Sequence, residues 1–84
     1  MNIFKERRIG TFELDQETIR RNYRLLFKLF AKVIVTSAGS EFPTDPVKYV
    51  GYSELFAPVG EGGTPPRYRV SYNRRKREWE ATPA

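Results

Sequence analysis

The sequence predicts an α+β fold, in which one amphipathic helix packs on a small, mostly antiparallel sheet in the order β-α-β-β-β. Two observations predict it. A helical pattern of apolar residues occupies one stretch early in the chain, and later stretches alternate aromatic or β-branched residues with polar ones between loops rich in proline and glycine. A chain of 84 residues supports one core. We therefore treat residues 1–84 as a single domain and expect residues 1–7 to be a mobile N-terminus.

The first two elements are a strand and the helix that follows it. Residues 8–14 predict a strand with Phe12 and Leu14 on one face. Asp15 suits the helix N-cap, because its carboxylate can accept a hydrogen bond from a free backbone N–H. The helix is expected over about residues 16–35. Its end has two interpretations, since the β-branched run 33–36 either finishes the helix or begins a strand after a shorter helix.

The apolar arc of this helix is wide. At about 100° per residue it covers about 200° of the helix surface. The stripe expected to face the core consists of Ile19, Tyr23, Leu26, Phe30 and Val33. Phe27 and Ile34 flank this stripe on one side, and Leu25 and Leu29 flank it on the other. One small sheet is too narrow to cover the whole arc, so we expect Leu25 and Leu29 to form a self-association surface in a homo-oligomer.

The remaining elements are predicted to be strands. Residues 47–56 are rich in aromatic and β-branched residues and predict a strand between two loops that contain proline. Residues 67–81 predict a hairpin. If its two-residue turn lies at 74–75, Trp79 is opposite Val70, and if the turn begins one residue earlier, Trp79 is opposite Tyr68. Both registers place Trp79 on the apolar face and the acids of the second strand opposite arginines of the first.

Several kinds of chemistry are excluded by composition. The chain has no cysteine and no histidine, which rules out disulfides, thiolate metal ligands, Ser–His–Asp and Cys–His catalysis, and zinc sites that contain histidine. Most acidic residues have a plain structural explanation, so we expect neither an enzyme nor a cofactor or metal. The glycine-rich loop at 60–63 lacks the Lys-Ser/Thr and the helix of a Walker loop and is interpreted as a strand connection.

The charge pattern favours an anionic partner. The net charge is +5 and the isoelectric point is near 9.8. One basic cluster lies at the predicted hairpin tip and another runs along the helix, where like charges at i, i+4 cost roughly 0.2–0.5 kcal/mol per pair. The clusters consist of Arg74, Arg75, Lys76 and Arg77 at the tip, and of Arg20, Arg24, Lys28 and Lys32 on the helix with Arg21 beside them.

Aromatic residues interleaved with arginines add a second candidate feature. Tyr49 and Tyr52 are candidates to stack on bases, with Arg67 and Arg69 as further polyanion ligands. Since the two tyrosines lie on opposite faces of their strand, one of them is expected to be exposed. The better interpretation of the other large aromatics of the sheet is that they belong to the core; these are Tyr68, Tyr72 and Trp79.

These patterns predict a small, non-enzymatic binding protein for nucleic acid or a phosphate-bearing nucleotide. Two alternatives stay open. One is a protein–protein inhibitor or assembly protein, of the size and composition of virus-encoded accessory proteins, whose basic faces meet an acidic protein surface. The other is an oligomeric sponge for a small nucleotide. No apolar run reaches the roughly 20 residues that cross a membrane, and the N-terminus is charged, so we expect a cytoplasmic protein with no membrane partner.

Overall fold

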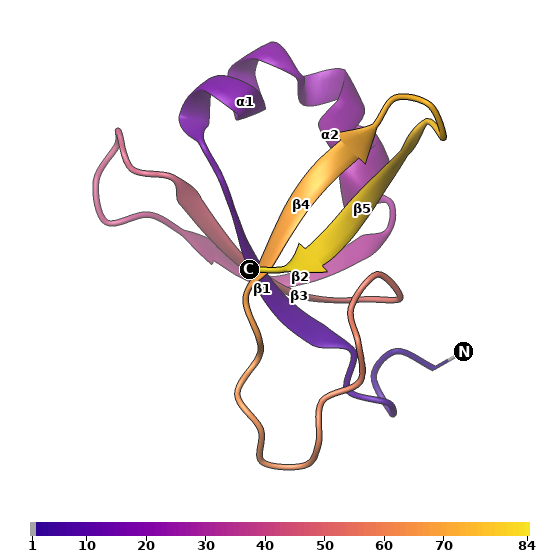
Figure 1. Cartoon of the computed structure of the whole chain (residues 1–84). Coiled ribbons are helices and arrows are strands. Elements are labelled where there is room, and N and C mark those ends of the chain that lie inside the picture. Colours follow the sequence, from indigo (N-terminus) through magenta and orange to yellow (C-terminus); the bar gives the residue numbers. More distant parts are fainter. Residues whose placement is uncertain (1) are drawn as a thin grey trace.

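The computed structural model describes residues 2–84 and confirms the α+β class. The two helices form an arch at one end of the molecule, and the long loop before the last hairpin extends at the other end (Figure 1). The five strands are divided between two antiparallel sheets, whereas the sequence predicted one sheet with fewer strands. The elements are β1 (Ile9–Leu14), α1 (Gln16–Arg21), α2 (Tyr23–Phe30), β2 (Val33–Gly39), β3 (Val47–Ser53), β4 (Tyr68–Asn73) and β5 (Glu78–Pro83).

The three-stranded sheet has β3 at its centre, with β1 and β2 antiparallel on either side. Phe12 and Leu14 of β1 are both buried, as the alternation of β1 predicted. Gly51 of β3 lies so close to β2 that a Cβ atom there would be 2.7 Å from the carbonyl oxygen of Ile34. Only glycine fits this approach without a backbone shift, which explains why glycine interrupts an otherwise aromatic strand.

The structure differs from one continuous helix over residues 16–35 at two points. First, the helix is broken at Asn22, whose φ of −118° and ψ of 31° are not helical. Second, α2 ends at Phe30, and the β-branched residues that follow pair with β3 as strand β2. The second of the two interpretations of this run is thus confirmed. Strand pairing prevails there because branched side chains are suited to a sheet and lose rotamer freedom in a helix.

The start of α1 follows the prediction closely. The carboxylate of Asp15 accepts a hydrogen bond from the backbone N–H of Thr18 at 2.6 Å. This bond, strengthened by a further interaction with the Thr18 side chain, holds the pKa of Asp15 below its ordinary value of 3.8. The helix N-terminus therefore carries a charged cap.

The β4–β5 hairpin has a longer turn than either predicted register allowed. Residues 74–77 form it, and Trp79 pairs with Tyr72, so both predicted registers are wrong. The physical reason is the side chain of Asn73. Its Oδ1 accepts hydrogen bonds from the backbone N–H groups of Arg75, at 3.0 Å, and Lys76, at 3.1 Å, and so holds the wider turn.

The faces of this hairpin were nevertheless predicted correctly. Trp79 and Tyr68 are buried on the same face. The acids of β5 lie on the other face, but they are opposite Ser71 and Asn73 rather than opposite arginines, because the pairing is shifted. A shift by two residues preserves the face, whereas a shift by one residue would have reversed it.

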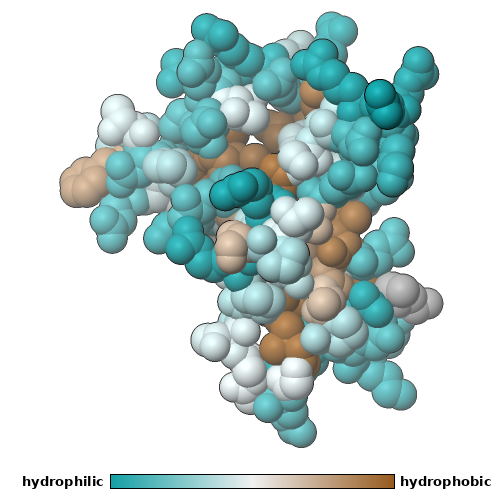
Figure 2. All heavy atoms as spheres, viewed as in Figure 1, coloured by the Kyte–Doolittle hydropathy of each residue, from teal (hydrophilic) through white to brown (hydrophobic). Residues whose placement is uncertain are grey.

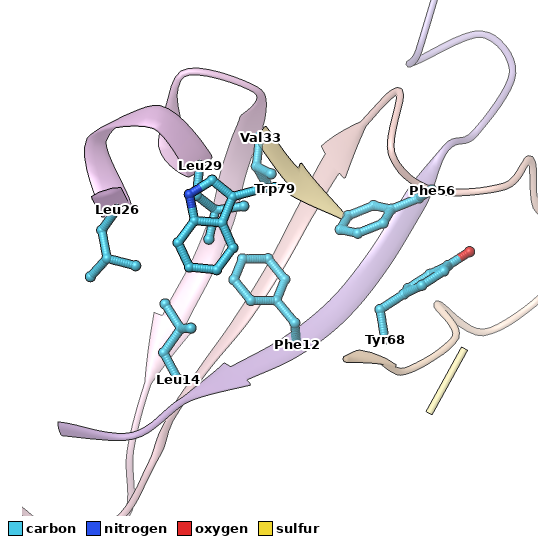
Figure 3. Close-up of a cluster of buried hydrophobic side chains, with 8 residues drawn as sticks. All are labelled: Phe12, Leu14, Leu26, Leu29, Val33, Phe56, Tyr68 and Trp79. Carbon is cyan, nitrogen blue, oxygen red and sulfur yellow. The ribbon is translucent and has the colours of Figure 1, made fainter. Parts of the chain in front are cut away.

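The core lies between the two sheets and under α2 (Figure 3). Phe56 and Leu29 are its most completely buried large apolar side chains. The Phe56 ring stacks on Tyr68 with centroids 4.6 Å apart. Phe30, expected to face the core, packs against it and on Tyr49 at 5.3 Å, but is only half-buried.

Two predictions about the helix surface need correction. Tyr23, expected in the core, is 54% exposed, and Leu29, expected at a self-association surface, has no exposed surface. Leu25 is half-buried against the core. The cause is the second sheet, which covers the leucine side of α2 and leaves the Tyr23 side open. Self-association itself stays a prediction, but Leu29 does not provide its surface.

The segment before β1 packs on the rest of the molecule. Its described part begins at Asn2 and forms a turn, and the backbone N–H of Val59 donates to the carbonyl of Arg7 at 3.0 Å. The ring of Phe4 lies 4.9 Å from that of Tyr52. These contacts tie the predicted N-terminal segment to β3 and to the loop that follows it.

Candidate nucleic-acid interface

The hairpin, whose turn carries one of the predicted basic clusters, packs against α2, which carries part of the other (Figure 1). The indole N–H of Trp79 donates to the carbonyl of Leu25 at 2.7 Å and fixes the hairpin against the helix. On the outer side of this junction the Lys28 ammonium lies 5.8 Å from the centre of the Tyr72 ring. Tyr72 is two residues before the hairpin turn, so Lys28 of the helical cluster lies near the base of the turn that carries the other cluster.

We call this surface the basic face. It comprises Arg24 and Lys28 of α2 and Arg74, Arg75, Lys76 and Arg77 of the hairpin turn. Among residues 2–84, Lys76 is the one member that forms an ion pair, with Glu80 at 3.7 Å. Figure 2 shows hydrophilic side chains over the helices and the hairpin end of the molecule. The other five cations of this face have no ion-pair partner among the described residues, and such a group favours a polyanionic partner.

The remaining helical cations do not belong to α2. The break at Asn22 places Arg20 on α1, which contributes no buried side chain. Arg21 forms an ion pair with Glu17 at 2.9 Å. Lys32 lies beyond the end of α2. The four-residue row predicted along one helix is thus reduced to the pair of cations on α2.

The hairpin turn holds its cations at a conformational cost. Arg77 has a φ of +55°, in the left-handed region. For an L-residue other than glycine, asparagine or aspartate this conformation costs roughly 1–2 kcal/mol. Glycine or asparagine would relieve it, and both are common at such turn positions. The turn therefore carries a cation at a position where the backbone conformation favours glycine or asparagine.

Two exposed aromatic rings border the basic face, and the sequence did not identify them as surface residues. Phe27 is 71% exposed and Tyr23 is 54% exposed, and their rings meet edge to face at 6.4 Å. The guanidinium of Arg24 lies 6.0 Å from the centre of the Tyr23 ring, within the range of a cation–π contact. The unusual width of the apolar arc was the signal that one side of the helix stays uncovered. Which side it is depends on the position of the hairpin.

A second region of interest is a cleft of about 510 Å³ between β1, β3 and the start of β4. It brings together three residues proposed from the sequence, Arg67, Arg69 and Tyr49. Its charge is partly compensated, because Glu13 lies 3.6 Å from the Arg67 guanidinium and 3.9 Å from the ammonium of Lys48. Arg69 lies five residues before Arg74, roughly 17 Å along the strand, so this cleft is distinct from the basic face.

The tyrosines proposed for base stacking are both half-buried against other rings. Tyr49 stacks on Phe12 at 5.2 Å and contacts Phe30 at 5.3 Å, and burial raises the pKa of its hydroxyl above 10.0. Tyr52 contacts Phe4. The expectation that one of the two is openly exposed is therefore wrong, because each strand face is covered by a different part of the chain.

The glycine-rich loop is organised around an arginine rather than an anion. The Arg7 guanidinium donates to the carbonyl of Gly60 at 3.0 Å and to that of Gly63 at 3.4 Å. The loop thus turns backbone carbonyls toward the Arg7 guanidinium, whereas a phosphate-binding loop would turn N–H groups toward an anion. This arrangement agrees with the interpretation of the loop as a strand connection.

No protein-family model matches this chain, and no curated protein or solved structure matches it either. Within residues 2–84, no three acidic side chains are grouped so that they could hold a metal ion. Neither helix in this part of the chain has the length and apolar character of a membrane span. The function must therefore be inferred from the geometry and charge of the surface.

Proposed function

We propose that this protein is a non-enzymatic nucleic-acid-binding protein and that the basic face is its contact surface. The observation that supports this most strongly is the packing of the hairpin on α2, which joins two cation clusters that are distant in the sequence. Phosphates can neutralise these cations, and the counterions that both partners release favour association. A cytoplasmic location and self-association are part of the same proposal.

The shape of the basic face suits a phosphate backbone. The cations lie on a helix and on a hairpin that pack against each other, so we expect one nucleic-acid strand to contact both elements. Most contacts of this kind position the nucleic acid without reading its sequence.

The first test is direct binding. Fluorescence anisotropy should detect association with labelled single- and double-stranded oligonucleotides at about 50 mM salt, and the affinity should fall as salt rises. The variant Arg24→Gln/Lys28→Gln should bind more weakly than the control Lys5→Gln/Lys48→Gln, which removes two exposed cations outside the basic face. If the parent protein binds neither strand type at this salt concentration, the proposal is wrong.

The protein-inhibitor alternative uses the same cations against an acidic protein surface. Polyglutamate is a suitable competitor, because it has negative charge without phosphates or bases. It should displace the oligonucleotide only at far higher charge concentration if the partner is nucleic acid. Equal displacement at equal charge would instead favour an acidic protein surface.

A second candidate function is supported by the cleft between the sheets. Its volume of about 510 Å³ is in the range of small-molecule sites, and Arg69 has no ion-pair partner among residues 2–84. A small phosphate-bearing nucleotide would suit it. A rise in melting temperature with nucleoside triphosphates that Arg69→Gln abolishes, without oligonucleotide binding, would support this candidate over the basic face.

A further inference from the structure

The exposed aromatic pair of α2 lies directly beside the cations of the basic face. At about 100° per residue, Arg24 and Lys28 occupy the part of the helix surface between the aromatic pair and the hairpin. The contacts agree with this order, since Arg24 lies over the Tyr23 ring and Lys28 lies over the Tyr72 ring. Moving outward from the hairpin, a ligand would meet cations first and exposed rings next.

These rings have no partner of their own among residues 2–84 that would bury them. Phe27 touches Tyr23 edge to face and keeps 71% of its surface exposed. Leaving a large aromatic ring in water is unfavourable, and such rings are often binding anchors. The occupant of this patch must therefore tolerate adjacent cations and offer flat apolar groups.

We propose, building on the function proposed above, that the basic face prefers single-stranded nucleic acid, and that Phe27 and Tyr23 stack on its unpaired bases. An unpaired strand exposes both the phosphates that cations bind and the base faces that aromatic rings bind. A duplex hides its base faces in the helical stack. The chemistry is shared by single-stranded DNA and single-stranded RNA.

A second copy of this chain fits the patch less well. Two copies that met through Phe27 would bring Arg24 and Lys28 of one copy close to those of the other. The basic face contains no acidic residue that could compensate these charges. Like charges at such close range repel. Charge complementarity thus selects an anionic ligand for this patch.

The test uses Phe27→Ala, which should leave the fold intact because the side chain is largely exposed. Two variants serve as controls. Phe27→Leu keeps much of the apolar surface but removes the aromatic ring. Phe42→Ala removes another exposed ring, 62% exposed, from the loop between β2 and β3, away from the basic face. Unchanged melting temperatures establish that all three variants are folded.

The probes are labelled oligothymidylate and oligouridylate of about 15 nucleotides, each compared with a duplex of the same length by fluorescence anisotropy. Phe27→Ala should weaken single-strand binding about 5- to 150-fold, the effect of removing one base–aromatic stack. Duplex binding should change little. The slope of log affinity against log salt should equal the parent's, because every phosphate stays bound. Phe27→Leu should resemble Phe27→Ala, and Phe42→Ala should resemble the parent.

Three results would overturn this inference without overturning the proposed function. The parent could bind duplex as tightly as single strands, or Phe27→Ala could keep the parent's single-strand affinity. The third is that Phe27→Leu retains full affinity. A parent that binds no oligonucleotide overturns both proposals. Light scattering that finds a parent dimer and a Phe27→Ala monomer with unchanged single-strand affinity would assign the patch to self-association.

Discussion

The inner and outer faces of α2 belong to one helix of eight residues but have opposite properties. On the inner face, Leu26 and Leu29 are buried, and the carbonyl of Leu25 binds the indole of Trp79. On the outer face, Phe27 and two cations are exposed without a covering element among residues 2–84. The inner face is thus fully packed, whereas the apolar and charged groups of the outer face are exposed to solvent. Mutations on the inner face should therefore lower stability, and mutations on the outer face should lower binding.

The hairpin repeats this contrast along its length. Its strands contribute Tyr68 and Trp79 to the core, and its turn contributes four cations and no buried side chain. Changes near the core should unfold the protein, and changes at the turn should affect ligands.

The largest expected effect is that of Trp79→Ala. Removing a large buried aromatic ring costs about 3–5 kcal/mol, which rivals the whole stability of a small domain. The variant also leaves the Leu25 carbonyl without its indole donor. Circular dichroism should show a largely unfolded protein at room temperature. A variant that melts within a few degrees of the parent would contradict the assignment of this ring to the core.

A smaller loss of stability is expected for Gly51→Ala. The added methyl group would lie 2.7 Å from the Ile34 carbonyl oxygen and 2.9 Å from a methyl group of Val33, so β2 and β3 must shift. Overpacking of this kind costs about 1–3 kcal/mol. Gly39→Ala is the matched control, because a Cβ atom there meets nothing within 4 Å. Urea unfolding that ranks the two variants equally would show that the strands are not held this closely.

Arg77→Gly should move stability and binding in opposite directions. Glycine relieves the left-handed backbone strain, so the free energy of unfolding should rise by up to about 1 kcal/mol. The same change removes one cation of the basic face, so nucleic-acid affinity should fall. Thermal melting and anisotropy on the same sample give both readouts. A variant that loses stability would contradict the strain at Arg77, and one that binds as well as the parent would exclude Arg77 from the binding surface.

Features set by local chemistry could be predicted from the sequence. The Asp15 cap, the buried face of β1 and the buried face of the hairpin all follow from hydrogen-bonding capacity or from the two-residue period of a strand. The hairpin register could not be predicted, because it depends on how the side chain of Asn73 bonds the turn. The predicted two-residue turns did not include this contact.

Features that depend on how the helices and sheets pack on one another could not be predicted from the sequence. Leu29 and Tyr23 both belong to the apolar arc predicted for one helix. Leu29 is buried and Tyr23 is exposed because the second sheet covers only the side of α2 that carries Leu29. The cation clusters themselves could be predicted from residue order. Their meeting on one surface could not, since it depends on the contact of Trp79 with Leu25.

The most direct test of the central claim is the salt dependence of oligonucleotide affinity in a set of neutralised variants. One variant changes Arg24 and Lys28 to glutamine, another changes Arg74, Arg75, Lys76 and Arg77 to glutamine, and a third combines both sets. If α2 and the hairpin turn bind one ligand together, each set should lower the slope of log affinity against log salt by roughly 0.7–0.9 for every phosphate that the variant no longer binds. The combined variant should show about the sum of the two reductions, with the parent's melting temperature retained. If both single-set variants keep the parent's slope, or if Lys5→Gln/Lys48→Gln lowers it as much, the basic face is not the binding surface.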